Sequence, residues 1–335
     1  MSELRRLDVL RAIVEDYVQS REPVGSKALL DRHNLGVSAA TIRNDMAALE
    51  EEGLIAAPHT SSGRIPTEKG YRRFVDQIEE LKPLSRPERD AINKILDGSH
   101  DLDDLLRSTV RLLSQLTNQV AMIQVPHYDL AHLKNLELVW LGGSQVLMVL
   151  ITSDGTVDQR MLTVDRVIGE EELQRSKIWL LTHFAGRQIA DLAQAESVPV
   201  PAELDAAFLN ELVDGISAMA LAAGKQRIVM AGTANLARSG RDFPLSITPV
   251  LEALEEQVVL LKLFSELEAD SRGVAVAIGA ENHYGQLLDT AVIATTYSND
   301  ARNKLGVLGP TRMNYPSSMA AVRAVARYLS RILTG

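Results

Sequence analysis

The 335-residue sequence has no cysteine, and this absence excludes several kinds of site. Without thiols the chain forms no disulfide, no cysteine zinc site and no thiolate nucleophile. It also lacks any run near the roughly 20 apolar residues that a membrane span needs. The longest apolar runs are short and strand-like, as from Val146 to Ile151, and Met1 to Arg6 contain no signal-peptide core. We therefore expect a cytoplasmic protein that does not contact a membrane.

An excess of basic residues is also missing. The net charge is −9, whereas phosphate contacts favour basic proteins. From Met1 to Phe74, eleven Lys and Arg residues balance eleven Asp and Glu residues, so the acidic excess lies in the rest of the chain. Charge alone gives no indication of DNA binding, and any case for it must come from the placement of individual residues.

Composition and motifs favour a soluble protein of two or three domains without catalytic chemistry. The hydrophobic fraction of 46% and the charged fraction of 24% are normal for a globular protein and exclude disorder. No nucleophile–base pair, metal-ligand set or phosphate-binding glycine loop is present in the sequence pattern. The sequence therefore predicts neither an enzyme, nor a cofactor, nor a metal site.

Three helices are predicted in the first fifty residues. Apolar residues at helical spacing indicate a helix over residues 3–20, and Pro23 prevents its continuation. Ser26 is expected to cap a short second helix by accepting hydrogen bonds from its first free amides. Ser38 is expected to cap a third helix, which Gly53 ends.

A hairpin and a fourth helix are predicted to follow. Residues 54–57 have a strand pattern, residues 58–64 form a polar turn, and Ile65 begins a short return strand. Thr67 is expected to cap the fourth helix. Three helices, a hairpin and a helix make a winged helix-turn-helix, in which the third helix enters the major groove of DNA with its amino end first.

The residues at the start of the third helix are suited to contact with bases. Small side chains there allow close approach, and Arg43 and Asn44 can form the paired hydrogen bonds that distinguish guanine and adenine. The start of the second helix offers amides and Lys27 to phosphate, and Arg64, predicted at the tip of the hairpin, can reach a neighbouring groove or the backbone. For any one residue, a cap or a solvated face is an equally good interpretation; the order of elements favours DNA binding. The candidate DNA-binding residues are Ser26, Lys27, Ser38, Ala39, Ala40, Thr41, Arg43, Asn44, His59, Thr60, Ser61 and Arg64.

Five segments carry a resemblance to a known family. In the first third of the chain they are Pro23 to Lys27, Val37 to Met46 and Pro58 to Thr67, and near the carboxy terminus they are Ile278 to Asn282 and Gly306 to Tyr315. Together they resemble the heat-inducible transcription repressor family, HrcA. The hairpin segment and the distal Gly-Pro-Thr-Arg-Met-x-Tyr motif, in this order, make the resemblance specific.

The resemblance implies a repressor of chaperone genes. It implies a homodimer that binds double-stranded DNA at an inverted repeat called CIRCE, is kept active by the GroEL chaperonin and loses activity during heat stress. It also implies an α+β multidomain fold, with a winged helix-turn-helix followed by a GAF-like α/β domain that carries an inserted dimerisation domain. A physical argument also favours a dimer. A single module buries limited surface on DNA, whereas a two-fold protein reads both halves of a two-fold site in one binding event.

The sequence pattern agrees with this division of the chain. We predict a winged helix-turn-helix DNA-binding domain over residues 1–81 and a linker over 82–90, where prolines interrupt any apolar period. Strand patterns before and after a helical stretch predict one sheet domain that is interrupted by an insertion, and the resemblance implies that this domain, residues 91–165 and 271–335, is GAF-like. The stretch between, residues 166–270, is the predicted inserted dimerisation domain.

Two alternatives stay open at this point. Since GAF domains often bind small molecules, the chain could instead be a winged-helix regulator controlled by a small metabolite in its GAF-like domain. Arg312, presented by the turn at Gly309 and Pro310, has two interpretations as well. The favoured one is a structural corner in which Arg312 binds carbonyls or a carboxylate, and the other is a contact with a further domain or with the chaperonin.

Overall fold

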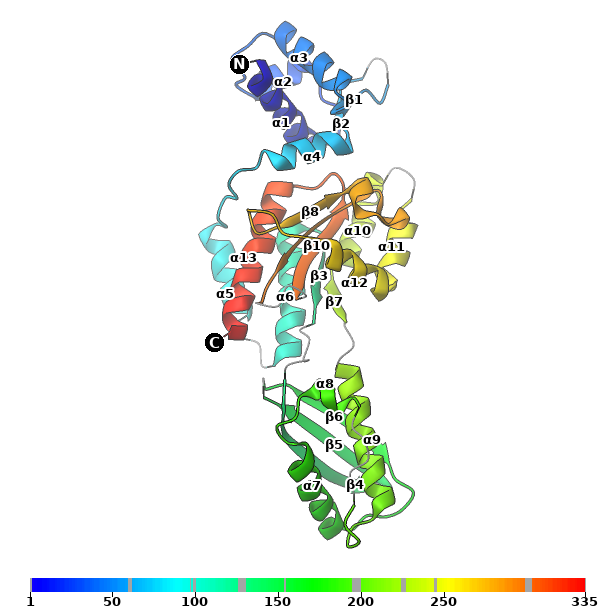
Figure 1. The fold of residues 1–335 in the computed structure, drawn as a ribbon. Helices are drawn as coiled ribbons and strands as arrows, with labels where there is room; N and C mark the ends of the chain where they lie inside the picture. The colour runs from blue at the N-terminus through cyan, green and yellow to red at the C-terminus, as the bar shows by residue number, and fades with distance from the viewer. Residues whose placement is uncertain are drawn as a thin grey trace. The chain divides into compact units, whose positions relative to one another are not determined.

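The computed structural model divides the chain into two compact units (Figure 1). The first contains Met1–Gln124 and Ile228–Gly335, and the second is Val125–Arg227. None of the helices in the described part is long and apolar enough to cross a membrane. The structure describes residues 2–59, 62–96, 98, 101–125, 131–153, 155–194, 200–223, 227–243, 246–298 and 303–334.

The first unit begins with the predicted series of helices and hairpin. The elements are α1 (Ser2–Ser20), α2 (Ser26–Arg32), α3 (Ala39–Glu51), β1 (Ile55–Ala56), β2 (Ile65–Pro66) and α4 (Glu68–Asp76). The two short strands pair antiparallel, with Ile55 opposite Pro66. The side chain of Thr67 accepts a hydrogen bond from the amide of Gly70 at 3.1 Å, which confirms the predicted cap of α4.

Two local predictions in this segment are wrong. Ser26 does not cap α2: Gly25 occupies the cap position without a side-chain hydrogen bond, and Ser26 is the first residue of the helix. The linker is also shorter at its carboxy end than the predicted 82–90, because α5 (Arg86–Leu96) already begins at Arg86. Glu88 explains this early start, since its carboxylate accepts hydrogen bonds from the amide and hydroxyl of Ser85 and fixes the first turn.

A five-stranded antiparallel sheet forms the core of the first unit. Its strands are β3 (Val120–Gln124), β7 (Ile228–Ala231), β8 (Ala275–Ile278), β9 (Thr290–Thr296) and β10 (Lys304–Pro310), in the order β7-β3-β10-β9-β8. Because side chains alternate along a strand, each strand contributes to both faces of the sheet, and both faces are covered.

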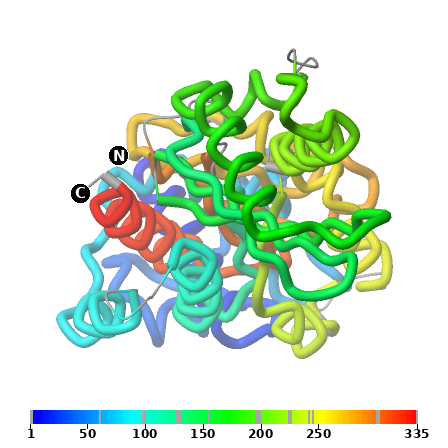
Figure 2. Tube along the Cα trace, turned by 90° about the horizontal axis from the view of Figure 1, so that it is seen from below, coloured from blue at the N-terminus to red at the C-terminus, as the bar shows by residue number. Residues whose placement is uncertain are grey.

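Both faces of this sheet are covered by helices, and the helices of the two faces come from different stretches of the chain (Figures 1 and 2). On one face lie α6 (Leu102–Thr117) and α13 (Tyr315–Thr334), with α5 packed against both. On the other, a buried cluster joins Val120, Val292 and Leu308 of the sheet to Leu254 and Phe264. The helices of that face are α10 (Thr233–Arg238), α11 (Thr248–Glu255) and α12 (Gln257–Glu266).

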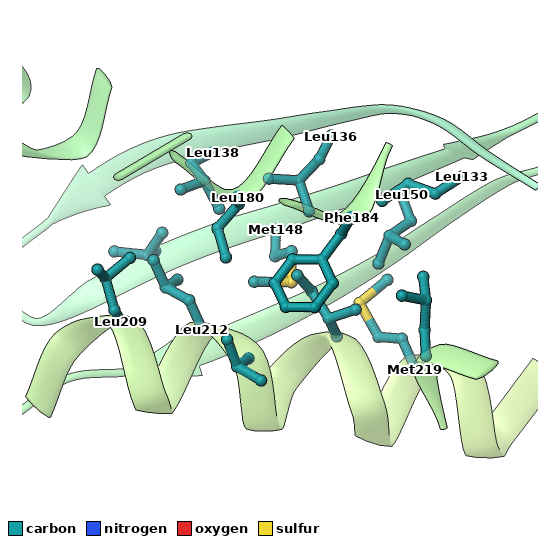
Figure 3. Close-up of a cluster of buried hydrophobic side chains, with 14 of the residues drawn as sticks. Leu133, Leu136, Leu138, Met148, Leu150, Leu180, Phe184, Leu209, Leu212 and Met219 are labelled. Carbon is teal, nitrogen blue, oxygen red and sulfur yellow. The ribbon is translucent and has the colours of Figure 1, made fainter. Parts of the chain in front are cut away.

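The second unit is a three-stranded antiparallel sheet with helices on one face. The strands β4 (Leu133–Gly142), β5 (Gln145–Thr152) and β6 (Val157–Thr163) lie in that order. The helices are α7 (Glu170–Phe184), α8 (Ile189–Leu192) and α9 (Ala206–Ala223). The core lies between them, with Leu136, Met148 and Leu150 of the sheet facing Phe184 and Leu212 (Figure 3).

This division does not coincide with the predicted one. Strands β4 to β6 were expected in the GAF-like domain, but they pack with α7 to α9 in the second unit. Conversely, residues 228–270 were expected in the insertion, but β7 adds to the edge of the large sheet beside β3. An alternating strand pattern indicates a strand with one buried face without indicating which helices bury it.

We predict that Phe184→Ala destabilises the second unit by about 3–5 kcal/mol, because it leaves a cavity in a fully buried position. Both tryptophans, Trp140 and Trp179, belong to this unit, so urea unfolding followed by tryptophan fluorescence reports on it. Ile178→Ala is the matched control, since Ile178 lies on the same helix and is 63% exposed. Equal losses from both variants would contradict the described core.

Candidate DNA-binding surface

The amino end of α3 presents a polar, narrow face to solvent. Ser38 accepts a hydrogen bond from the amide of Thr41 at 3.2 Å, as the sequence predicted for the cap. The hydroxyls of these two residues lie 3.1 Å apart. Ser38 and Ala40 are exposed, and Ala39 and Thr41 are partly so. This end carries small side chains only, and its free amides give it a partial positive charge that favours phosphate.

Arg43 and Asn44 lie exposed on the next turn of α3. Among the residues that the structure describes, neither has an ion pair or hydrogen bond partner for its side chain. Their donors and acceptors are therefore available to an external group. The structure thus brings Ser38, Ala39, Ala40, Thr41, Arg43 and Asn44 together on one continuous stretch of helix surface.

The opposite face of α3 is held against the rest of the segment. Ile42, Met46 and Leu49 are buried. Asp45, which is also buried, accepts hydrogen bonds from Nε and Nη2 of Arg5 at 2.7 and 3.0 Å. Such a bidentate pair fixes angle as well as distance. It fixes the rotation of α3 against α1, and the sequence offered no signal for it because the two residues lie 40 positions apart.

The helix preceding α3 is also fixed through its carboxy end. The buried carboxylate of Asp16 on α1 accepts a hydrogen bond from Arg32 at 3.1 Å and lies 2.9 Å from Nε2 of His33. Ser26 and Lys27 form the first turn of α2 at the other end. Lys27 is exposed and makes no side-chain contact within the described part of the chain, whereas Ser26 is partly buried.

The sequence predicted Arg64 at the tip of the hairpin, and this prediction is wrong. The backbone of Arg64 pairs with Val24, with N–O distances of 2.8 and 2.9 Å, so this residue belongs to the base of the hairpin. Its guanidinium donates to Glu50 on α3 at 2.9 Å and to the carbonyl of Ser62 at 3.2 Å. A cation already paired with a carboxylate has less charge to offer a phosphate, and Arg64 orients the hairpin against α3.

The hairpin tip is only partly described. His59 is exposed, and its amide donates to the hydroxyl of Ser62 at 3.0 Å. Thr60 and Ser61, both candidate DNA contacts, lie outside the described residues. No residue other than glycine fits at position 63, because a Cβ there would meet the backbone of Pro23 and Val24 at 2.6 Å. The hairpin therefore crosses the α1–α2 connection at close range.

Arginine side chains join α1 and α4 to the five-stranded-sheet part of the first unit. Arg312 is buried, ion-pairs with the buried Asp242, and lies 3.4 Å from the carbonyls of Tyr17 and Val18 at the end of α1. Arg312 thus binds carbonyls and a carboxylate, as the favoured interpretation states, but the carbonyls belong to α1 of the predicted DNA-binding domain, so the contact with a further domain is present as well. The same contacts tie α1 to the element after β10, so Arg312 bridges two parts of this unit.

Further arginine contacts fix α4. Arg72 pairs with Glu281 and donates to the carbonyl of Val276 at 2.6 Å. Arg272 donates to the carbonyls of Val75 and Ile78, the latter at 3.2 Å. Sequence reasoning missed all of these contacts, since each joins residues about 200 positions apart.

Two tyrosines lie within the same contact region. The rings of Tyr71 and Tyr315 have centroids 5.8 Å apart, and burial raises the pKa of both phenols above the ordinary value. Both phenols are neutral at physiological pH, and the hydroxyl of Tyr315 donates a hydrogen bond to the carbonyl of Thr311 at 2.5 Å. Within the described residues, no group of three or more His, Asp or Glu side chains could hold a metal ion.

Comparison with known proteins adds to this geometry. The model of the HrcA protein C terminal domain matches residues 103–319. A heat-inducible transcription repressor HrcA of Pseudarthrobacter chlorophenolicus is 60% identical over 99% of both chains. Another, of Clavibacter michiganensis subsp. michiganensis, is 53% identical over 98% of both. A crystal structure described as that of a hypothetical protein, 24% identical, covers 98% of this chain and 97% of its own with a TM-score of 0.67 and has the same fold.

We predict that Ser38→Ala destabilises the first turn of α3 by about 0.5–2 kcal/mol, because the amide of Thr41 loses its acceptor. Ser38→Asp should keep this stability, since Asp caps helices as well as Ser does. Amide hydrogen exchange of peptides covering residues 38–46 measures both effects. If the Asp variant exchanged as fast as the Ala variant, Ser38 would not act as the cap.

Proposed function

The chain belongs to the heat-inducible transcription repressor HrcA family, and from this premise we propose that it represses chaperone genes by binding an inverted-repeat CIRCE operator as a homodimer in the cytoplasm. The amino end of α3 enters the major groove, and a second copy does the same at the other half-site. The single observation that carries the proposal is that Arg43 and Asn44 are exposed, without a side-chain partner among the described residues, on a helix whose opposite face is fixed.

In this proposal the residues divide by role. Arg43 and Asn44 read base edges, and Thr41 offers a methyl or hydroxyl group to a base. Ser38, Ala39 and Ala40 allow the close approach, while Ser26 and Lys27 contact phosphate at the start of α2. The hairpin residues His59, Thr60 and Ser61 contact the adjacent backbone. Arg64 contributes indirectly, since its pairing with Glu50 positions that hairpin.

The second unit is the dimerisation domain in this proposal, and the five-stranded sheet with its helices is the GAF-like domain. Across β4, β5 and β6 the side chains of Val139, Leu147 and Met161 stand in register on the face opposite the core. Val139 and Met161 are 44% and 49% exposed. An apolar sheet face open to water is unfavourable, and a second copy would bury it.

Control by temperature follows the family expectation. The GroEL chaperonin keeps the repressor in its active form, and unfolded proteins that occupy the chaperonin during heat stress lower the repressor's activity. Dimerisation gives this control leverage, because linking two half-site contacts raises affinity by about 10²- to 10⁴-fold. Loss of folded dimer therefore lowers operator occupancy, because monomers bind a half-site too weakly to replace it.

Arg43→Ala should weaken operator binding by about 1–3 kcal/mol while changing binding to random DNA much less, because a base contact is lost. Lys27→Ala is the contrasting variant. It should weaken binding to both DNAs equally and reduce the slope of log K against log salt by about one. Electrophoretic mobility shifts over a salt series measure both, and equal weakening on both DNAs by Arg43→Ala would make Arg43 a phosphate contact.

Met161→Glu should shift the protein toward the monomer, because it places a charge in the proposed apolar interface. Ile178→Glu is the control, an exposed apolar residue on α7 of the same unit. Sedimentation velocity measures the monomer fraction, and circular dichroism confirms that both variants fold. An unchanged dimer in the Met161 variant would exclude this sheet face as the interface.

A further inference from the structure

A groove of about 610 Å³ between α5 and α13 is lined by an unusual number of arginines. Arg86 and Arg89 come from α5, and Arg327 and Arg331 come from α13, which packs beside it (Figure 2). Asp90 is the one carboxylate among the described lining residues. The lining therefore carries a formal charge of +3 in a chain whose net charge is −9.

The described residues neutralise the arginines of this groove poorly. Arg86 lies 4.0 Å from Asp90, and both side chains are largely exposed, so this pair is weak. Arg331 stacks on the ring of Tyr328, 4.4 Å from its centroid. Arg89 and Arg327 are exposed and have no ion pair with another described residue.

Like charges are also spaced along α13 in a way that a helix does not favour. Arg323, Arg327 and Arg331 follow at intervals of four, which places them on one face, where equal charges repel. Arg323 shows the effect: burial, and then the charge of Arg327, lower its pKa. Arg323 and Arg327 line a neighbouring groove as well. An arrangement that costs helix stability, with no counter-charge from the described residues, indicates an external anion.

We propose that this groove binds an oligophosphate anion, such as the phosphate chain of a nucleotide. Four guanidinium groups on two facing helices offer several planar, bidentate donor pairs, and a chain of phosphates supplies matching oxygens and three to four negative charges. A single carboxylate would leave most of these donors unmatched. The groove volume lies within the range of roughly 300–1,000 Å³ of small-molecule sites.

The chemistry of the groove disfavours an acidic protein as the ligand. Stable protein interfaces have an apolar or aromatic centre. Here the apolar side chains of the lining are Ile92, which is buried, and Ala324, and the ring of Tyr328 is already covered by Arg331. The groove is formed by α5 and α13, whereas the proposed DNA-binding surface lies on α3. The test of the groove therefore does not depend on operator binding.

Isothermal titration calorimetry of the full chain with inorganic tripolyphosphate, and separately with ATP without magnesium, tests the proposal. The native protein should bind one anion per chain. The double variant Arg89→Gln/Arg327→Gln should bind it about tenfold more weakly or worse, because it loses two guanidinium groups that have no ion pair with a described residue. Arg175→Gln, an exposed arginine on α7 outside the groove, should bind like the native protein. Tighter binding of ATP than of tripolyphosphate would identify a nucleotide, and equal binding would identify the phosphate chain alone.

Two results would overturn the proposal. One is the absence of tripolyphosphate and ATP binding by the native protein, and the other is equal binding by the native protein and the double variant. A non-operator DNA duplex serves as a further ligand. If the double variant lost duplex binding while neither small anion bound the native protein, the groove would be a DNA contact instead.

Discussion

The orientation of the exposed face of α3 depends on the bidentate pair between Arg5 and the buried Asp45. A helix packed only by apolar side chains can rotate by small amounts without large cost, whereas two hydrogen bonds to one carboxylate define a single orientation. That orientation buries Ile42 and Met46 and leaves Arg43 and Asn44 outside. The proposed DNA-binding surface is therefore oriented by contacts on the opposite face of α3.

The same principle holds where the amino-terminal segment meets the large sheet. Arg72, Arg272 and Arg312 each bind main-chain carbonyls of a helix or strand together with a carboxylate. The pair of Arg312 with Asp242 is buried on both sides, so loss of either partner would leave an uncompensated charge. Each arginine links the main chain of one element to a carboxylate near another. In the first unit these contacts hold α1 and α4 against the part that contains the five-stranded sheet.

Local structure was predictable where local chemistry determines it. The caps at Ser38 and Thr67 and the order of helices and hairpin follow from residue types within a few positions of each other. The cap at Ser26 was wrong because a sequence pattern does not say whether Gly25 or Ser26 takes the extended conformation that precedes a helix. Arg64 was misplaced for a related reason, since its position depends on pairing with Val24, 40 residues earlier.

Tertiary partnership was not predictable in the same way. The strands from residue 133 to 163 were recognised as strands, but their alternation is compatible with burial under any helices, and the structure places α7 and α9 there. The candidate site was predictable as a set of exposed residues on α3, while the pairs that orient it, Arg5 with Asp45 and Arg64 with Glu50, were not. Family resemblance supplied the function, which no single distance in the structure defines.

The most direct test of the account uses the absence of cysteine from the chain. A single Cys introduced at the exposed position of Ala40 can carry an iron-chelate cleavage reagent. Bound to the operator, this protein should cut the DNA at two clusters related by the symmetry of the inverted repeat, because each α3 lies in one half-site. Cleavage that is absent, or no stronger than from the same reagent at position 178 on α7, would contradict the placement of α3 in the groove.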